Sequence, residues 1–105
     1  MEVYSVEPVI AERQYTLTGD DGLATPVLVR LGAPRESPDG LDYICPFEIT
    51  GLARTRIKWA FGVDALQALE LALKMLGADL HAHRADYGPG FFLDEMGDDL
   101  GFSED

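Results

Sequence analysis

The sequence predicts an α+β fold of two layers, in which one helix packs on a four-stranded antiparallel sheet. Three observations predict it: four short stretches have the side-chain pattern of strands, one later stretch has helical periodicity, and all the strands precede the helix. Consecutive strands are joined by turns or, at 33–40, by a loop, so the sheet is expected to be a meander. The strands are expected at about 9–18, 26–32, 42–50 and 54–61, and the helix at about 64–82.

A chain of 105 residues is enough for one domain and not for two. We expect residues 1–90 to form that domain and residues 91–105 to form an acidic, partly docked C-terminal tail. In the tail, 91–93 is either a short final strand or a plug against the sheet.

The first two strands each alternate between an inward and an outward face. A turn made of Asp and Gly, at 19–22, separates them. The inward residues are predicted to be Ala11, Arg13, Tyr15 and Leu17 on the first strand, and Val27, Val29 and Leu31 on the second.

The third and fourth strands are predicted to form a hairpin around Gly51-Leu52-Ala53, a common loop length. In the register we predict, Glu48 lies opposite Arg56 and Cys45 lies opposite Trp59, so that opposite charges meet. The faces expected to point inward are Tyr43, Cys45, Phe47 and Ile49 on one strand, and Thr55, Ile57, Trp59 and Phe61 on the other.

The helix has a predicted N-cap at Asp64, and Gln67 completes a capping box. We expect the helix to continue through Gly77, because leucines recur beyond it. The predicted buried stripe has spacings of three and four residues: Leu66, Leu69, Leu73, Leu76 and Leu80.

The charge of the chain is strongly acidic, with 19 Asp and Glu against eight Lys and Arg and a net charge of −11. This balance argues against nucleic acid and against anionic membranes as partners. Seven of the acids, and no Lys or Arg, lie from Asp86 onward. The tail is therefore either a solvating segment or a contact surface for a basic partner, with candidate residues Asp94, Glu95, Asp98 and Asp99.

The remaining composition places the chain among soluble cytoplasmic proteins. A single cysteine excludes an intrachain disulfide. No stretch is long and apolar enough to span a bilayer, and the first residues lack the pattern of a signal peptide.

No catalytic or metal-binding constellation emerges from the sequence. Cys45 reads as a small buried side chain, and His81 and His83 have the wrong spacing for a helical zinc site. Phosphate-loop, calcium-loop and nucleophile-elbow patterns are absent from the sequence. We expect no metal and no cofactor, and a non-enzymatic role is favoured over an enzymatic one.

Five residues of the predicted sheet are candidate binding residues. Arg13 faces inward, where a buried guanidinium requires an acidic partner or an anionic ligand, and Trp59 is expected beside it with Tyr43. Arg54, Arg56 and Lys58 form a basic row on the outer face, which is either solvated or used for contact with another molecule.

Three segments of the sequence form a recognisable set: Ala11-Glu12-Arg13, the stretch YICPFEITGL at 43–52, and the helix start GVDALQAL at 62–69. Together they resemble a family of small uncharacterised bacterial domains of unknown function. The resemblance runs over most of residues 9–80 and implies a fold class and a bacterial origin. It implies no catalytic residue.

We therefore interpret the chain as a domain that acts through protein–protein contact, for which inhibition of a basic toxin is one case. Two alternatives stay open. One is a small enzyme or a binding protein for a small molecule or anion, with a pocket between helix and sheet. The other is a homo-oligomeric structural module joined through the open sheet face.

Overall fold

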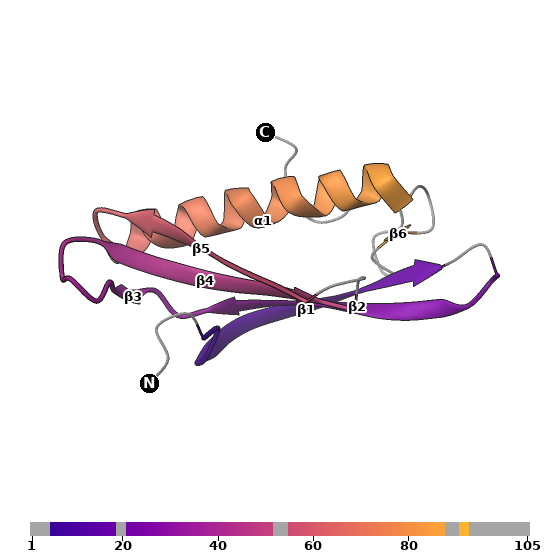
Figure 1. Ribbon diagram of the computed structural model, residues 1–105, viewed down its shortest axis with the longest axis horizontal. Helices are drawn as coiled ribbons and strands as arrows, with labels where there is room; N and C mark the ends of the chain where they lie inside the picture. Colours follow the sequence, from indigo (N-terminus) through magenta and orange to yellow (C-terminus); the bar gives the residue numbers. More distant parts are fainter. Residues whose placement is uncertain (1–4, 19–20, 52–54, 88–90, 93–105) are drawn as a thin grey trace.

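The structure, a computed structural model, describes residues 5–18, 21–51, 55–87 and 91–92. It confirms an α+β fold with an antiparallel sheet and one long helix, α1, which runs along one face of the sheet (Figure 1). The elements in chain order are β1 (Val9–Thr18), β2 (Ala24–Gly32), β3 (Arg35–Glu36), β4 (Tyr43–Thr50), β5 (Arg56–Gly62), α1 (Ala65–Tyr87) and β6 (Phe91–Phe92).

The four predicted strands form the predicted meander, as β1, β2, β4 and β5. The expected loop between β2 and β4 contains the two-residue strand β3. Tyr43 and Ile44 pair with both β3 and β5, which must therefore lie on opposite edges of β4. At the other side of the sheet β6 pairs with β1, so the sheet runs β5-β4-β2-β1-β6, with β3 continuing the line of β2.

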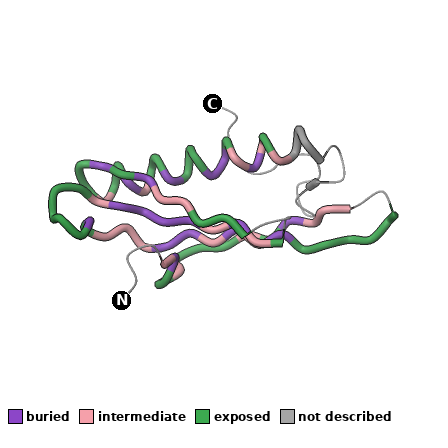
Figure 2. Tube along the Cα trace, in the orientation of Figure 1, coloured by how far each residue is buried: buried purple, intermediate pink, exposed green. Residues whose placement is uncertain are grey.

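The hydrophobic core lies between the sheet and α1. The inward faces predicted for β2 and β4 are confirmed, because Val27, Val29, Cys45, Phe47 and Ile49 are all at most 3% exposed. On β1, Tyr15 is buried and Leu17 packs against the core, as expected, whereas Ala11, also expected to point inward, is exposed next to a register shift of the strand. Figure 2 shows the resulting pattern, with buried positions on the helix face that looks onto the sheet and exposed positions on the other.

The predicted β4–β5 register is wrong by one residue. Cys45 pairs with Ala60 instead of Trp59, and Glu48 pairs with Ile57 instead of Arg56. Because side chains alternate along a strand, a shift of one residue exchanges the two faces of β5. Lys58, Ala60 and Gly62 therefore lie on the helix side of the sheet, and Ile57, Trp59 and Phe61 lie on the outer side.

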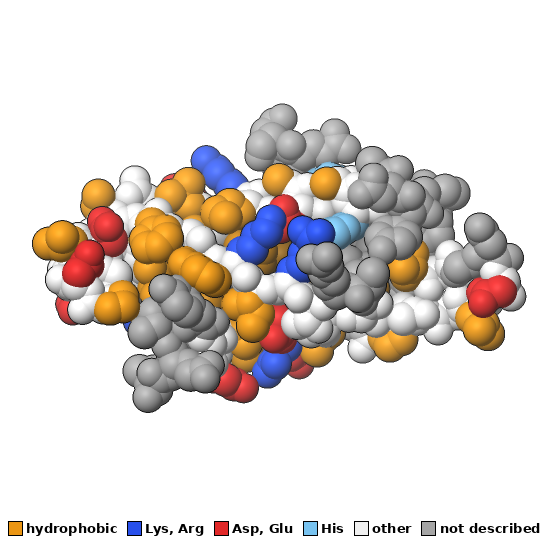
Figure 3. All heavy atoms as spheres, in the orientation of Figure 1, with side chains coloured by type: hydrophobic (Ala, Val, Ile, Leu, Met, Phe, Trp, Pro, Cys, Tyr) orange, Lys and Arg blue, Asp and Glu red, His pale blue; other side chains and the backbone are white. Residues whose placement is uncertain are grey.

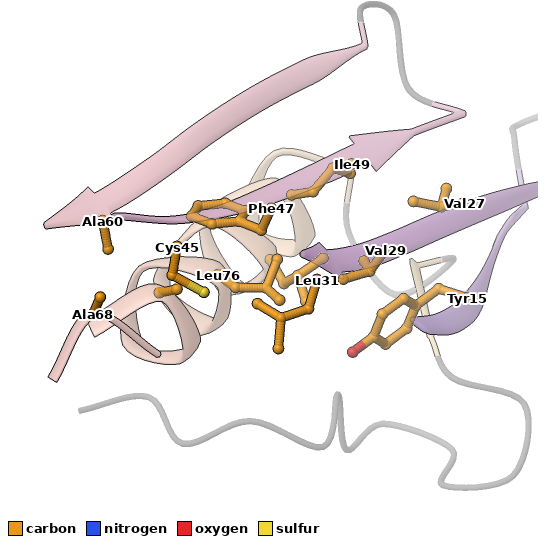
Figure 4. Close-up of a cluster of buried hydrophobic side chains, with 12 residues drawn as sticks. Tyr15, Val27, Val29, Leu31, Cys45, Phe47, Ile49, Ala60, Ala68 and Leu76 are labelled. Carbon is orange, nitrogen blue, oxygen red and sulfur yellow. The ribbon is translucent and has the colours of Figure 1, made fainter. Parts of the chain in front are cut away.

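The close approach of α1 explains this exchange. Ala60 and Ala68 are almost fully buried and point toward each other beside Cys45 (Figure 4). A Cβ added to Gly62 would lie 2.4 Å from the backbone nitrogen of Ala68, so the first turn of α1 rests directly on the strand. The tryptophan and phenylalanine rings do not fit into a gap of that width, whereas a methyl group does.

The predicted N-cap of α1 is confirmed. The Gln67 N–H donates to Asp64 Oδ1 at 2.8 Å, and Gln67 Oε1 accepts from the Val63 N–H at 2.7 Å. The helix continues through the buried Gly77, as expected, and ends at Tyr87 instead of residue 82.

The buried stripe of α1 differs from the predicted leucine stripe. It consists of Ala68, Ala72, Leu76 and Leu80, each at most 1% exposed. Leu66 is 74% exposed and Leu73 is 41% exposed, so the helix is turned to bring alanines onto β4 and β5. Small side chains at this contact allow the close approach.

The segment before β1 covers part of the outer face. Val6 is buried, and a Cβ at Gly32 would lie 2.3 Å from its carbonyl oxygen. The Arg35 guanidinium holds this segment by donating to the carbonyl oxygens of Ser5 at 2.7 Å and Glu7 at 2.9 Å. Residues 5–8 thus shield the outer face around Pro46, while the outer side of β5 has no such cover within the described chain.

Candidate protein-contact surface

Three hydrophobic side chains follow one another along the outer side of β5: Ile57, Trp59 and Phe61, which we call the β5 row. Ile57 is 40% exposed, Phe61 is 52% exposed, and Trp59 is half-buried. Figure 3, in the orientation of Figure 1, shows hydrophobic side chains gathered along the course of β5. The row is a contiguous apolar surface on an edge strand of the sheet.

A second apolar row borders β5 from the helix side. Leu71 and Met75 are each 37% exposed and lie one helical turn apart, in line with Asp79. Asp79 forms an ion pair with Lys58 of β5, with Nζ–Oδ2 at 2.9 Å and Nζ–Oδ1 at 3.2 Å. This flank of the helix therefore faces the open side of β5, and we call Leu71 and Met75 the α1 row.

The backbone of β5 lies between these two rows. Within the described residues, β5 pairs with β4 alone, so its other edge carries a line of backbone donors and acceptors without a neighbouring strand. Native sheets usually protect such an edge with charged side chains, proline or a bulge. Here Arg56 and Lys58 stand at the start of the strand, and the half from Trp59 to Gly62 contains no charged residue.

A pocket of about 200 Å³ opens on the outer face beside the β5 row. Two carboxylates lie at this pocket, which gives it an acidic character next to aromatic rings. Hydrogen bonds from the Ser37 hydroxyl and the Leu41 N–H lower the pKa of the Asp39 carboxyl, so Asp39 is charged at neutral pH. The lining residues are Ser37, Pro38, Asp39, Asp42, Ile44, Trp59 and Phe61.

The charged side chains of the outer face differ from the prediction. Glu48, predicted opposite Arg56, instead forms an ion pair with Arg30 of β2 at 3.2 Å. Arg30 also lies 3.5 Å from Glu7 and 3.9 Å from Glu12, so three carboxylates surround one guanidinium. The predicted basic row is not on this face, because Arg56 and Lys58 lie on the helix side.

The residues proposed for a pocket between helix and sheet are not brought together. Arg13 and Tyr43 lie on the helix side and are half-buried, whereas Trp59 lies on the outer side. Arg13 is engaged in an interaction within the protein. The structure therefore does not form the predicted Arg13–Tyr43–Trp59 pocket.

The Cys45 thiol is fully buried, and its S–H donates to the Gly32 carbonyl oxygen at 3.4 Å. Burial raises the pKa of this thiol to about 11, although Arg35 acts in the opposite direction. A thiol that stays protonated and out of contact with water is a poor nucleophile. Cys45 is therefore a packing residue.

Several predicted site residues lie outside the described part of the chain. They are Arg54 and the four tail acids Asp94, Glu95, Asp98 and Asp99. Among the residues that are described, no group of three or more His, Cys, Asp or Glu side chains is arranged to hold a metal ion, and no helix has the length and apolarity to cross a bilayer.

Sequence reasoning named Trp59 but missed the rest of the two apolar rows. Ile57 and Phe61 were assigned to the core, and the exposed Leu71 and Met75 were not singled out. One signal was present in the sequence: Ala60 and Gly62 are small enough to lie against a helix that is itself rich in alanine. Small residues on both β5 and α1 indicate which face of the strand packs against the helix.

One family model matches the chain, over residues 11–103, and it describes a domain of unknown function (DUF6968). The match extends beyond residues 9–80, over which the sequence resemblance runs, and includes most of the acidic tail. No curated protein and no solved structure matches the chain.

Proposed function

The chain belongs to this family of unknown function, and we propose that it acts through protein–protein contact along the β5 edge of its sheet. The observation that carries this proposal is the exposure of the β5 row beside a strand edge that no other strand of the described chain pairs with. A second protein segment that adds to this edge gains main-chain hydrogen bonds, and its side chains cover the β5 row.

The chemistry of the surface supports this role. Exposed apolar patches on soluble domains mark interaction sites, and aromatic residues are enriched at the centres of interfaces. The β5 row supplies two aromatic side chains and one β-branched side chain, while the α1 row supplies two flexible apolar side chains. Apolar contact is thus available on both sides of the strand that a partner would extend.

Site-specific photocrosslinking tests the proposal. A photoreactive residue at Phe61 of the full chain should form a defined adduct in cells that express the protein. Gln14 is the matched control, because it is an exposed residue on the outer face of the same sheet but on β1. An adduct at Phe61 and none at Gln14 supports contact at the β5 edge, whether its mass is that of two chains or of the chain plus another protein. Adducts at Gln14 alone, or none at either position, would refute it.

The acidic tail is a second candidate contact. Its motive is the charge distribution, since seven acids and no bases lie from Asp86 onward. Such a surface attracts a basic partner and loses that attraction as salt rises. Deleting residues 94–105 should then abolish the capture, at low salt and without crosslinking, of the protein that the Phe61 adduct identifies. Capture that is unchanged by the deletion and by high salt would exclude the tail.

A further inference from the structure

We propose that the segment added to the β5 edge is β5 of a second copy of this chain, paired antiparallel about a two-fold axis at Trp59. This inference rests on the proposed contact function and names its partner. The resulting dimer has one continuous sheet, with both helices on the same side of it. Four features of the described residues support it: the side-chain pattern of β5, the helix flank, the charges at the two ends of the strand, and the number of large hydrophobic side chains beside its edge.

The β5 row is symmetric about its central residue. If Trp59 lies opposite Trp59 of the second copy, then Ile57 lies opposite Phe61 of that copy and Phe61 opposite its Ile57. Residues that face each other in an antiparallel pair lie on the same side of the sheet. The two β5 rows therefore merge into one apolar strip of six side chains, whereas a register shifted by one residue would bring apolar residues opposite Arg56, Lys58 and Ala60.

The helix side of the strand is compatible with the same axis. The α1 row borders the open side of β5, as the Lys58–Asp79 ion pair shows. The two-fold axis would bring Leu71 and Met75 of one copy toward the same residues of the other, above the joined strands. Both faces of the new strand pair would then carry apolar contact, which a strand added to an edge needs for stable association.

Charge favours the antiparallel arrangement. Arg56 opens β5, and the exposed Asp64 follows its end. Antiparallel pairing places Arg56 of one copy opposite Gly62 of the other, two residues from its Asp64. Parallel pairing would instead bring like charges together. Exposed pairs of this kind contribute less to affinity than to the choice of orientation.

The extent of exposure is also consistent with a second copy. Each chain offers five large hydrophobic side chains next to one strand edge, so an isologous contact uses ten. The net charge of −11 on each chain opposes self-association, and we expect screening by salt to reduce this repulsion. The association of two copies should therefore persist at high salt, whereas capture of a basic protein should weaken.

The experiment is sedimentation or light scattering of the purified full chain at 150 mM and 500 mM salt, from about 1 µM to about 1 mM chain, the range from moderate to weak association. The molar mass should rise from that of one chain to that of two as the concentration increases. The midpoint, the concentration at which half of the chains are dimeric, should not be higher at 500 mM salt than at 150 mM. Phe61→Lys should raise the midpoint at least tenfold, because it places charge in the apolar strip. Leu66→Lys is the matched control: Leu66 is 74% exposed but lies on the other flank of α1, so its midpoint should equal that of the wild type.

A second measurement tests the position of the axis. Trp59→Cys should crosslink to its own copy with a short thiol-reactive linker, because the two positions lie opposite each other. Leu23→Cys, which is 67% exposed and lies in the turn before β2, away from β5, should not crosslink. The buried Cys45 does not interfere in the folded chain. Urea unfolding of Phe61→Lys establishes that the variant is folded, and Ile57→Lys replaces it if it is not.

The outcomes separate this inference from the proposed function. A chain that stays monomeric over the whole concentration range overturns the second-copy proposal. Equal midpoints for Phe61→Lys and wild type overturn it as well. If the Phe61 photoadduct then has the mass of the chain plus another protein, contact at the β5 edge still holds. If no adduct forms, both proposals fail.

Discussion

Gly62→Ala should strongly destabilise the protein, because α1 rests on the backbone at this position. The new Cβ would lie 2.4 Å from the Ala68 nitrogen and 2.9 Å from the Gln67 carbonyl carbon, where ordinary contact begins near 3.4 Å. Both obstructing atoms belong to the backbone of the first helical turn, so no side-chain rotation relieves the overlap. The helix must move about 1 Å away from the strand, which loosens the packing of Ala68 and Ala72.

Overpacking of a core contact costs about 1–3 kcal/mol, and the backbone overlap places Gly62→Ala near the upper end, at about 3 kcal/mol. The assay is urea unfolding extrapolated to water, at one fixed chain concentration because association would shift the apparent stability. Gly40→Ala is the matched control. Its φ of +75° disfavours alanine, but no atom lies within 4 Å of the new Cβ. The expected cost of this control is about 1 kcal/mol.

The comparison of these two glycine variants decides the argument. Suppose that Gly62→Ala lowers the free energy of unfolding by no more than Gly40→Ala does, and that the dependence of this free energy on urea concentration is unchanged. Then α1 does not press on β5. The explanation for the exchanged faces of β5 would fail with it. If the cost is near 3 kcal/mol, a suppressor that shortens a helix side chain should not restore stability, because the obstruction is backbone.

Three further predictions concern single interactions. Asp64→Ala should lower the unfolding free energy by about 1 kcal/mol through loss of the N-cap, and Asp64→Ser should recover most of it; equal losses for the two variants would contradict the cap. Lys58 and Asp79 should show a coupling of about 0.5–1 kcal/mol in a double-mutant cycle, because both are partly exposed, and a coupling of zero would mean that the pair contributes nothing. The Cys45 thiol has its pKa raised from 9.0 to about 11, so the unfolded chain ionises first. The protonated thiol therefore makes its full contribution to the free energy of unfolding below pH 9. As pH rises toward 11 this contribution is lost, which lowers the free energy of unfolding by about 2–3 kcal/mol in total. Cys45→Ala should lack this alkaline decline, and an identical decline in both proteins would show that other groups cause it.

The alternation of apolar residues predicted β1, β2 and β4 well. In those strands only one face is rich in large apolar side chains, so the choice of the inward face is forced. The N-cap is equally local: Asp64 accepts from the Gln67 N–H of the first helical turn, and the Gln67 side chain accepts from the Val63 N–H just before the helix, wherever the helix packs. Such features are predictable because each depends on residues that are neighbours in sequence.

The candidate contact surface was not predictable in the same way. Both faces of β5 allow a plausible inward set: Ile57, Trp59 and Phe61 by hydrophobicity, or Ala60 and Gly62 by size. Hydrophobicity alone selects the wrong face. The width of the gap between α1 and the sheet selects the right one, and that width depends on residues far apart in the chain, such as Cys45 and Ala68.

The sequence by itself determined the order of the elements, the meander of the sheet and the start of the helix, because strand alternation, turn chemistry and capping act over a few residues. Only the tertiary structure decided which side of β5 faces the helix. Close packing of alanines and glycine against a strand leaves no volume for aromatic rings, which are therefore displaced to the surface. That displacement creates the β5 row, and with it the surface on which the proposed contact depends.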